Sequence, residues 1–139
     1  MLLDNQLSVI FGYICRNHIH DAEISNQKHT INNHIVEILQ YITNNYRNTT
    51  LESVAEHYGY AVPYLSRLIK KSTGFSYSSF TGELRYKKAC TLLATSNLTL
   101  YDICILSGYG CIEHFHRVFK RKSGQTPHAY RKSHQEKLY

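Results

Sequence analysis

The sequence predicts an all-α protein in which one long helix joins two similar pairs of helices. Three observations lead to this prediction. Apolar residues recur at spacings of three and four, the period-two alternation of strands is never sustained, and one helical pattern occurs twice about fifty residues apart.

The first part of the chain is expected to hold a helix, a linker and a second helix. An amphipathic helix over residues 1–16 is predicted by Leu3, Leu7, Ile10 and Ile14. Residues 17–33 are polar and rich in Asn and His, as in a linker. A second helical stripe then consists of Ile35, Ile38, Leu39, Ile42 and Tyr46, and the segment NYRNTT interrupts it.

The repeat relates residues 50–74 to residues 99–124. Leu51-x-x-Val54-Ala55 recurs as Leu100-x-x-Ile103-Cys104, Gly59-Tyr60 as Gly108-Tyr109, and RLIKKSTG (67–74) as RVFKRKSG (117–124). Thr50 and Thr99 are in place to cap the first helices, and Gly74 and Gly124 to end the second ones. This is the order of a helix-turn-helix, whose second helix enters the major groove. Any small helical bundle can contain similar hairpins, so the assignment depends on what the second helices expose.

Both second helices have an apolar face and a polar face. The faces expected to be buried hold Leu65, Leu68 and Ile69 in the first copy and Phe115, Val118 and Phe119 in the second. The opposite faces hold Pro63, Ser66, Arg67 and Lys70, and, fifty residues later, Glu113, His116, Arg117 and Lys120.

The chemistry of these polar faces suits a DNA duplex. Arg67 and Arg117 can each present a planar fork of donors to guanine O6 and N7. Basic residues towards the helix ends are better placed for phosphates: Lys70, Lys71, Lys120, Arg121 and Lys122. A basic face that is merely solvated is the alternative for each helix taken separately.

Residues 76–95 predict the long connecting helix, with Ser76 as its N-cap. At 1.5 Å per residue it would be about 30 Å long. That nearly matches the ~34 Å turn of B-DNA, so the two basic helices could enter successive major grooves.

Composition limits the function classes. The formal charge is +6, and residues 31–139 hold 14 (16 − 2) basic against 7 (10 − 3) acidic residues, which favours a polyanionic partner: nucleic acid, anionic membrane or acidic protein. No apolar run approaches the ~20 residues that a membrane span needs. The cysteines (Cys15, Cys90, Cys104 and Cys111) lack metal-binding spacing and indicate reduced thiols of a cytoplasmic protein.

No enzyme, metal or cofactor is expected. The best catalytic material is His114-Phe115-His116, but histidines two apart on a helix point in different directions. The alternative function left open is a protein-interaction module whose basic faces dock on an acidic partner such as RNA polymerase.

Four motifs carry a resemblance to a known family. They are A-x-x-x-G-Y-x-x-x-Y-L-S-R-L-x-K (55–70), R-x-x-x-A-x-x-L-L (85–93), I-x-x-x-x-G-Y (103–109) and F-x-R-x-F-K-x-x-x-G-x-T-P-x-x-Y-R (115–131). Through them, residues 33–132 resemble the DNA-binding domain of the AraC/XylS transcription regulators. The resemblance implies seven helices, two helix-turn-helix units, and binding to double-stranded promoter DNA to activate or repress bacterial transcription.

The resemblance also implies roles for particular residues. The base-reading positions would be Pro63, Ser66, Arg67, Glu113, His116 and Arg117. Thr126 would cap a final helix that has Pro127 in its first turn, followed by a tail over residues 133–139. Residues 1–32 resemble the trailing helix and linker of a preceding regulatory domain. No effector site is therefore expected in this chain, and dimerisation could use the N-terminal helix or the missing domain.

Several residues depart from the family pattern. Ala61 stands where the family usually has Ser as N-cap of the first reading helix, which would cost ~1 kcal/mol. Ile69 and Cys104 replace the usual Phe and Ala. Glu113 replaces a small polar residue and would prefer a cytosine N4 amine to a phosphate.

Overall fold

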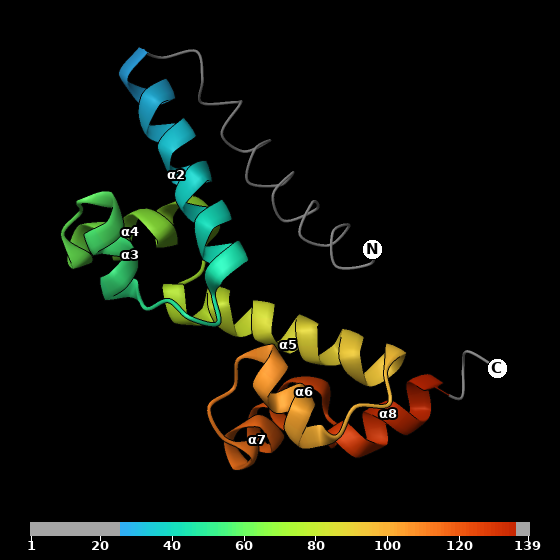
Figure 1. Ribbon diagram of the computed structural model, residues 1–139. Coiled ribbons are helices and arrows are strands. Elements are labelled where there is room, and N and C mark those ends of the chain that lie inside the picture. Colours follow the sequence, from blue (N-terminus) through green and yellow to red (C-terminus); the bar gives the residue numbers. More distant parts are fainter. Residues whose placement is uncertain (1–25, 136–139) are drawn as a thin grey trace. The chain divides into compact units, whose positions relative to one another are not determined.

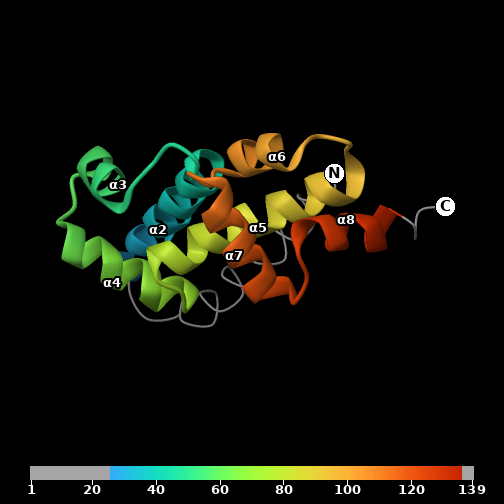
Figure 2. The ribbon, with the colours of Figure 1, turned by 90° about the horizontal axis from the view of Figure 1, so that it is seen from below.

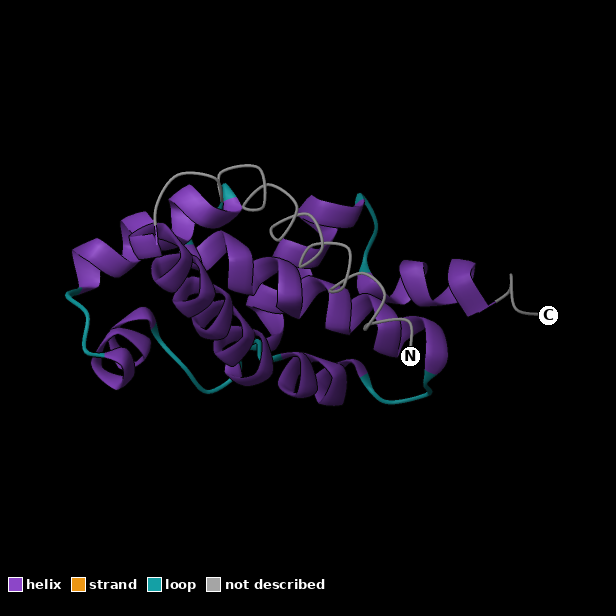
Figure 3. Cartoon of the chain, turned by 90° about the horizontal axis from the view of Figure 1, so that it is seen from above, coloured by secondary structure: helices purple, strands orange, loops and turns teal. Residues whose placement is uncertain are grey.

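The structure is a computed structural model that describes residues 26–135 (Figure 1). Over these residues it consists of seven helices and no strands (Figure 3). They are α2 (Asn26–Asn45), α3 (Leu51–Tyr58), α4 (Val62–Thr73), α5 (Tyr77–Thr95), α6 (Leu100–Ser107), α7 (Ile112–Ser123) and α8 (Pro127–Gln135). The predicted all-α fold of seven helices is confirmed. The helix expected over residues 1–16 lies outside the described residues.

The chain divides into two compact units, the first ending at Gly82 and the second beginning at Glu83. In unit 1, α2 packs against both α3 and α4 (Figure 2). The side chains buried among these helices are Ile35, Ile38, Leu39, Ile42, Val54, Ala55, Leu65 and Ile69. The four isoleucine and leucine residues of the predicted stripe thus form the buried face of α2, while Tyr46 follows the end of α2 and is half-buried.

In unit 2, the buried core joins the second half of α5 to α6 and α7. It comprises Ala89, Leu93, Ile103, Cys104, Tyr109, Phe115 and Phe119. Helix α8 closes this core through Tyr130, whose ring meets Phe119 edge to face at 5.2 Å between centroids. Within the described residues, no helix is long and apolar enough to cross a membrane.

The two turns between paired helices have the same hydrogen bonds. Gly59 has φ +73° and Gly108 has φ +91°. The amides of the following Tyr60 and Tyr109 donate to Ala55 O at 2.8 Å and Cys104 O at 3.0 Å. This is the Schellman arrangement, in which a left-handed residue ends one helix and turns the chain sharply. In unit 2, Arg85 Nε of α5 also donates to Gly108 O at 3.2 Å.

The repeat continues beyond the paired helices. Thr73 Oγ1 accepts from Phe75 N at 3.0 Å, and Ser123 Oγ accepts from Gln125 N at 3.1 Å. The next helices are capped alike, because Ser76 Oγ accepts from Ser79 N and Thr126 Oγ1 accepts from Ala129 N, both at 3.2 Å. The predicted caps at Ser76 and Thr126 are confirmed, as are those at Thr50 and Thr99.

Two helices are longer than the sequence pattern predicts. Helix α2 begins at Asn26, inside the segment expected as a linker. Asn and His cost well under ~1 kcal/mol each in a helix, so a helix anchored by the buried isoleucines can continue through them. Helix α8 runs to Gln135, past the expected start of the tail, because Gln135 Nε2 donates to Ser96 O at 3.0 Å and His134 stacks on Tyr130.

We predict that Gly59→Ala lowers the free energy of unfolding by about 1 kcal/mol, because a β-carbon is disfavoured at positive φ. An added Cβ at Gly59 would meet nothing within 4 Å, so the loss reports backbone strain alone. Gly110→Ala is the matched control, since that site is equally open and its φ is not positive. Urea unfolding followed by circular dichroism measures both. Equal effects of the two substitutions would contradict the assignment of strain to φ.

Candidate nucleic-acid interface

Helix α4 is fixed in unit 1 by two fully buried side chains one turn apart, Leu65 and Ile69. Helix α7 is fixed in unit 2 by Phe115 and Phe119 in the same way. The burial classes of residues 61–70 and 111–120 are identical position by position. The predicted buried faces are therefore confirmed at these four residues, while Leu68 and Val118 are half-buried.

The helix N-termini differ between the two copies. Ala61 precedes α4 with no side-chain hydrogen bond to the helix, as the sequence predicts. Cys111 precedes α7 and its Sγ accepts from His114 N at 3.4 Å. The thiol thus supplies a weak cap to the second helix that the first helix lacks.

The structure places the predicted base-reading residues on the outer sides of α4 and α7. Pro63, Arg67, Glu113 and Arg117 are exposed, and Ser66 and His116 are half-buried. Within each helix, residues 63, 67 and 70, or 113, 117 and 120, follow one another at spacings of four and three. Each set therefore forms one surface, opposite the buried pair of its own helix.

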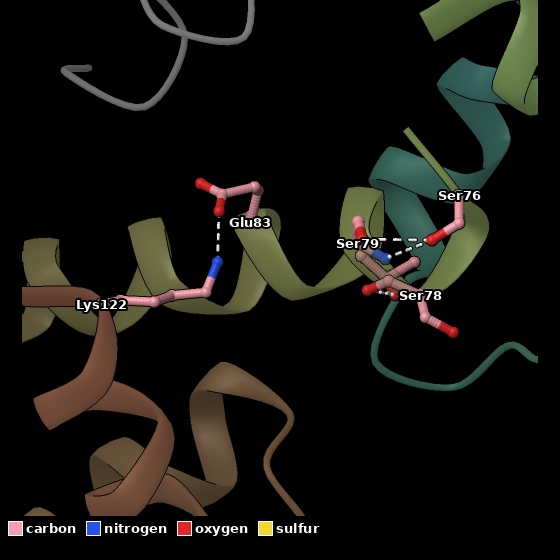
Figure 4. Close-up of polar contacts among 6 residues, drawn as sticks. Ser76, Ser78, Ser79, Glu83 and Lys122 are labelled. Atoms are coloured by element: carbon pink, nitrogen blue, oxygen red, sulfur yellow. Dashed lines mark hydrogen bonds and ion pairs between the residues drawn. The ribbon is translucent and has the colours of Figure 1, made fainter. Parts of the chain in front are cut away.

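The basic residues predicted to bind phosphate fall into two groups. Lys70, Lys71, Lys120 and Arg121 are exposed and make no ion pair with any described residue. Lys122 instead pairs with Glu83 of α5 (Figure 4). Its ammonium nitrogen also lies over the Tyr86 ring, 5.4 Å from the ring centroid. Four of the five cations are thus available to a polyanion without first breaking an ion pair.

Sequence reasoning missed two aromatic residues on the same exposed surfaces. Tyr64 and His114 occupy matched positions, and both are exposed. Each ring packs on the tyrosine of its own turn, with Tyr60–Tyr64 centroids at 5.4 Å and Tyr109–His114 centroids at 6.2 Å. The signal that could have found them is the recurrence of an aromatic side chain at the same place in both copies.

Two ionisable side chains packed behind α7 in unit 2 have raised pKa values. Burial raises the pKa of Tyr130 to about 12 and also raises the pKa of the Cys90 thiol beside it. Tyrosine and cysteine are already mostly neutral at physiological pH, so burial extends this neutral state to higher pH. Among residues 26–135, no group of three or more His, Cys, Asp or Glu side chains is arranged to hold a metal ion.

Two helices joined by a tight glycine turn, the second helix buried on one side and basic on the other, define a helix-turn-helix protein, and this chain has the arrangement twice. A family model described as a helix-turn-helix domain matches residues 54–133. The chain belongs to the AraC/XylS family of transcription regulators, and its described part is a DNA-binding domain of that family.

Individual relatives agree with this assignment. YfiF of Bacillus subtilis, an uncharacterized HTH-type transcriptional regulator, is 33% identical over 104 residues, which are 74% of this chain and 33% of YfiF. AarP of Providencia stuartii, an HTH-type transcriptional activator, is 32% identical over 100 residues, covering 71% of this chain and 74% of AarP. The chain thus spans a third of YfiF but three quarters of AarP.

Among solved structures, the C-terminal domain of AraT, a response regulator from Geobacillus stearothermophilus, is similar to this chain. The TM-score is 0.66 at 34% sequence identity, over 70% of this chain and 82% of that one.

We predict that Ala61→Ser raises the free energy of unfolding by about 1 kcal/mol, because a hydroxyl at this extended residue can accept from an orphan amide of α4. Cys111→Ala should lower it by roughly 0.5 kcal/mol, since it removes the weaker thiol cap of α7. Thermal unfolding measures both changes. A loss of stability in Ala61→Ser would show that the first turn of α4 is already satisfied.

Proposed function

We propose that this protein binds double-stranded promoter DNA in a sequence-specific manner, with α4 and α7 reading successive major grooves. The observation that carries the proposal is the repetition: two helices of 12 residues expose arginines and lysines at matched positions and bury matched positions. If the basic residues served only solubility, they would not need to occupy matched positions in α4 and α7. A major groove admits one such helix.

Within this proposal the exposed residues have separate tasks. Arg67 and Arg117 lie near the centre of each outer surface, where a guanidinium fork can reach guanine O6 and N7. Pro63, Ser66, Glu113 and His116 flank them as further base contacts, with Glu113 suited to a cytosine amine. Lys70, Lys71, Lys120 and Arg121, nearer the helix ends, would hold phosphates and fix the register without reading sequence.

The spacing of the two reading helices is part of the proposal. Helix α5 has 19 residues, so it extends about 28 Å at 1.5 Å per residue. We propose that a connecting helix of this length lets the two readers meet grooves one B-DNA turn, ~34 Å, apart.

The proposal extends from the DNA-binding domain to the role of the whole protein. We expect a cytoplasmic transcription regulator without enzymatic activity, in which regions outside the described residues provide dimerisation or effector binding. Contact with RNA polymerase would accompany DNA binding in an activator, as AarP is named, and would not replace it.

Selection of bound duplexes from a random pool tests the proposal directly and supplies the cognate site. A selected sequence with two separate blocks about one helical turn apart is expected. A pool that shows no enrichment would contradict sequence-specific binding.

We predict that Arg67→Ala and Arg117→Ala each weaken binding to the cognate duplex by about 1–3 kcal/mol while hardly affecting random DNA. Arg67→Lys and Arg117→Lys are the controls. They keep the charge but lose the planar fork, so they too should lose discrimination between the two duplexes. Fluorescence anisotropy with both duplexes measures the effect. Equal losses on cognate and random DNA would show that these arginines contact phosphates alone.

We predict that Lys120→Ala weakens binding to cognate and random DNA alike, because a phosphate contact carries no sequence information. If ~6 phosphates are neutralised, log K falls against log[salt] with a slope near −5, and removing one contact makes that slope shallower by about 0.9. Titrations at several salt concentrations give these slopes. A loss confined to the cognate duplex would place Lys120 at a base instead.

A further inference from the structure

Lys122 is the one basic residue proposed for phosphate binding on α7 that the structure shows paired to a carboxylate. It follows Glu113 by nine residues, about two and a half helical turns, and so lies on the opposite side of α7 from the reading surface. Its ammonium group contacts Glu83 Oε1 (Figure 4). It also lies over the face of the Tyr86 ring. Lys122 is exposed as a residue, so the ion pair with Glu83, and not burial, is what occupies its ammonium group.

The contact continues into the core of unit 2. Tyr86 packs on Phe119, with ring centroids 5.3 Å apart, and Phe119 precedes Lys122 by about one turn of α7. Two successive side chains on the back of α7 therefore contact the same ring of α5. The matched position in the first copy is Ser72, so α4 has no equivalent cation.

We infer that Glu83, Tyr86 and Lys122 form a clamp that fixes the rotation of α7 about its own axis, and that Lys122 is a positioning residue and not a phosphate contact. The inference rests on the proposed DNA binding. A base contact needs its side chain held within about 0.5 Å and 10–20°. A contact on the back of a helix resists rotation, so releasing it moves Arg117 without removing a charge from the DNA surface.

The test compares Lys122→Met with Lys120→Met, because methionine keeps an unbranched stem and removes the charge. For each variant, affinities for cognate and random duplexes are measured at several salt concentrations. Lys122→Met is expected to lower the ratio of cognate to random affinity roughly two- to fivefold, as for loss of one partly exposed pair. The salt slope should stay unchanged. Lys120→Met should instead make the slope shallower by about 0.9 and leave the ratio unchanged.

Variants of Glu83 separate the clamp from an effect of Lys122 alone. Glu83→Gln should lower the ratio as much as Lys122→Met does, and the double variant should lose little more, because both substitutions break one interaction. Exchanging the charges in Glu83→Lys with Lys122→Glu should restore part of the ratio. Removing the Glu83 carboxylate should strengthen binding to every duplex. This general gain affects cognate and random affinities alike, so it cancels in their ratio, which is why the ratio is measured.

Either of two binding results would overturn the clamp. Tighter binding of Glu83→Gln to both duplexes, together with a shallower slope in Lys122→Met, would make Lys122 a phosphate contact for which Glu83 competes. An unchanged ratio of cognate to random affinity in both Lys122→Met and Glu83→Gln would show that this contact does not position α7 for base reading. A double-mutant cycle by thermal unfolding without DNA must also show coupling between residues 83 and 122. Failure of the wild-type protein to prefer its selected duplex would instead refute the proposed function, and the cycle would still report on the clamp.

Discussion

The burial of one side of α4 and of α7 is the constraint on which the rest of the molecule depends. A helix of 12 residues is marginal in water by itself, so each reading helix exists because its large side chains at positions i and i+4 are removed from solvent. Deleting one such side chain, as in Phe119→Ala, would cost about 3–5 kcal/mol. Because the buried side is fixed, the opposite side is fixed too. The same apolar residues therefore determine both the stability of the helix and the surface that it offers to a ligand.

The glycine turns transmit this constraint to the preceding helices. The left-handed residue and the amide of the next tyrosine set the angle at which α3 meets α4 and α6 meets α7. The tyrosine that follows each glycine then packs on a ring in the first turn of the reading helix. One short turn thus ends a helix, sets the crossing of the pair and supports an exposed aromatic side chain beside the arginine.

Much of the fold and of the candidate site could be predicted from the sequence, because a pattern that occurs twice indicates which positions have the same structural role. Helix order, the buried pairs and most caps follow from apolar period and from residues such as Thr99 and Thr126, which act on their immediate neighbours. What escaped prediction depends on partners distant in the chain. The end of α8 is set by a hydrogen bond from Gln135 to a carbonyl 39 residues earlier, and the pairing of Lys122 by a carboxylate 39 residues earlier. Local periodicity holds no information on either contact.

The two copies share one buried geometry and add different polar contacts to it. In unit 1, Tyr60 is anchored to α2, where its hydroxyl lies 2.6 Å from His34 Nδ1, and its ring packs on Tyr64. Ring packing responds little to salt. In unit 2, the back of α7 is fixed by an ion pair that is partly exposed and therefore subject to screening. The difference lies in one matched position, because residue 122 is lysine where the first copy has Ser72. Under the proposed function, the support of α7 is therefore more sensitive to ionic strength than that of α4.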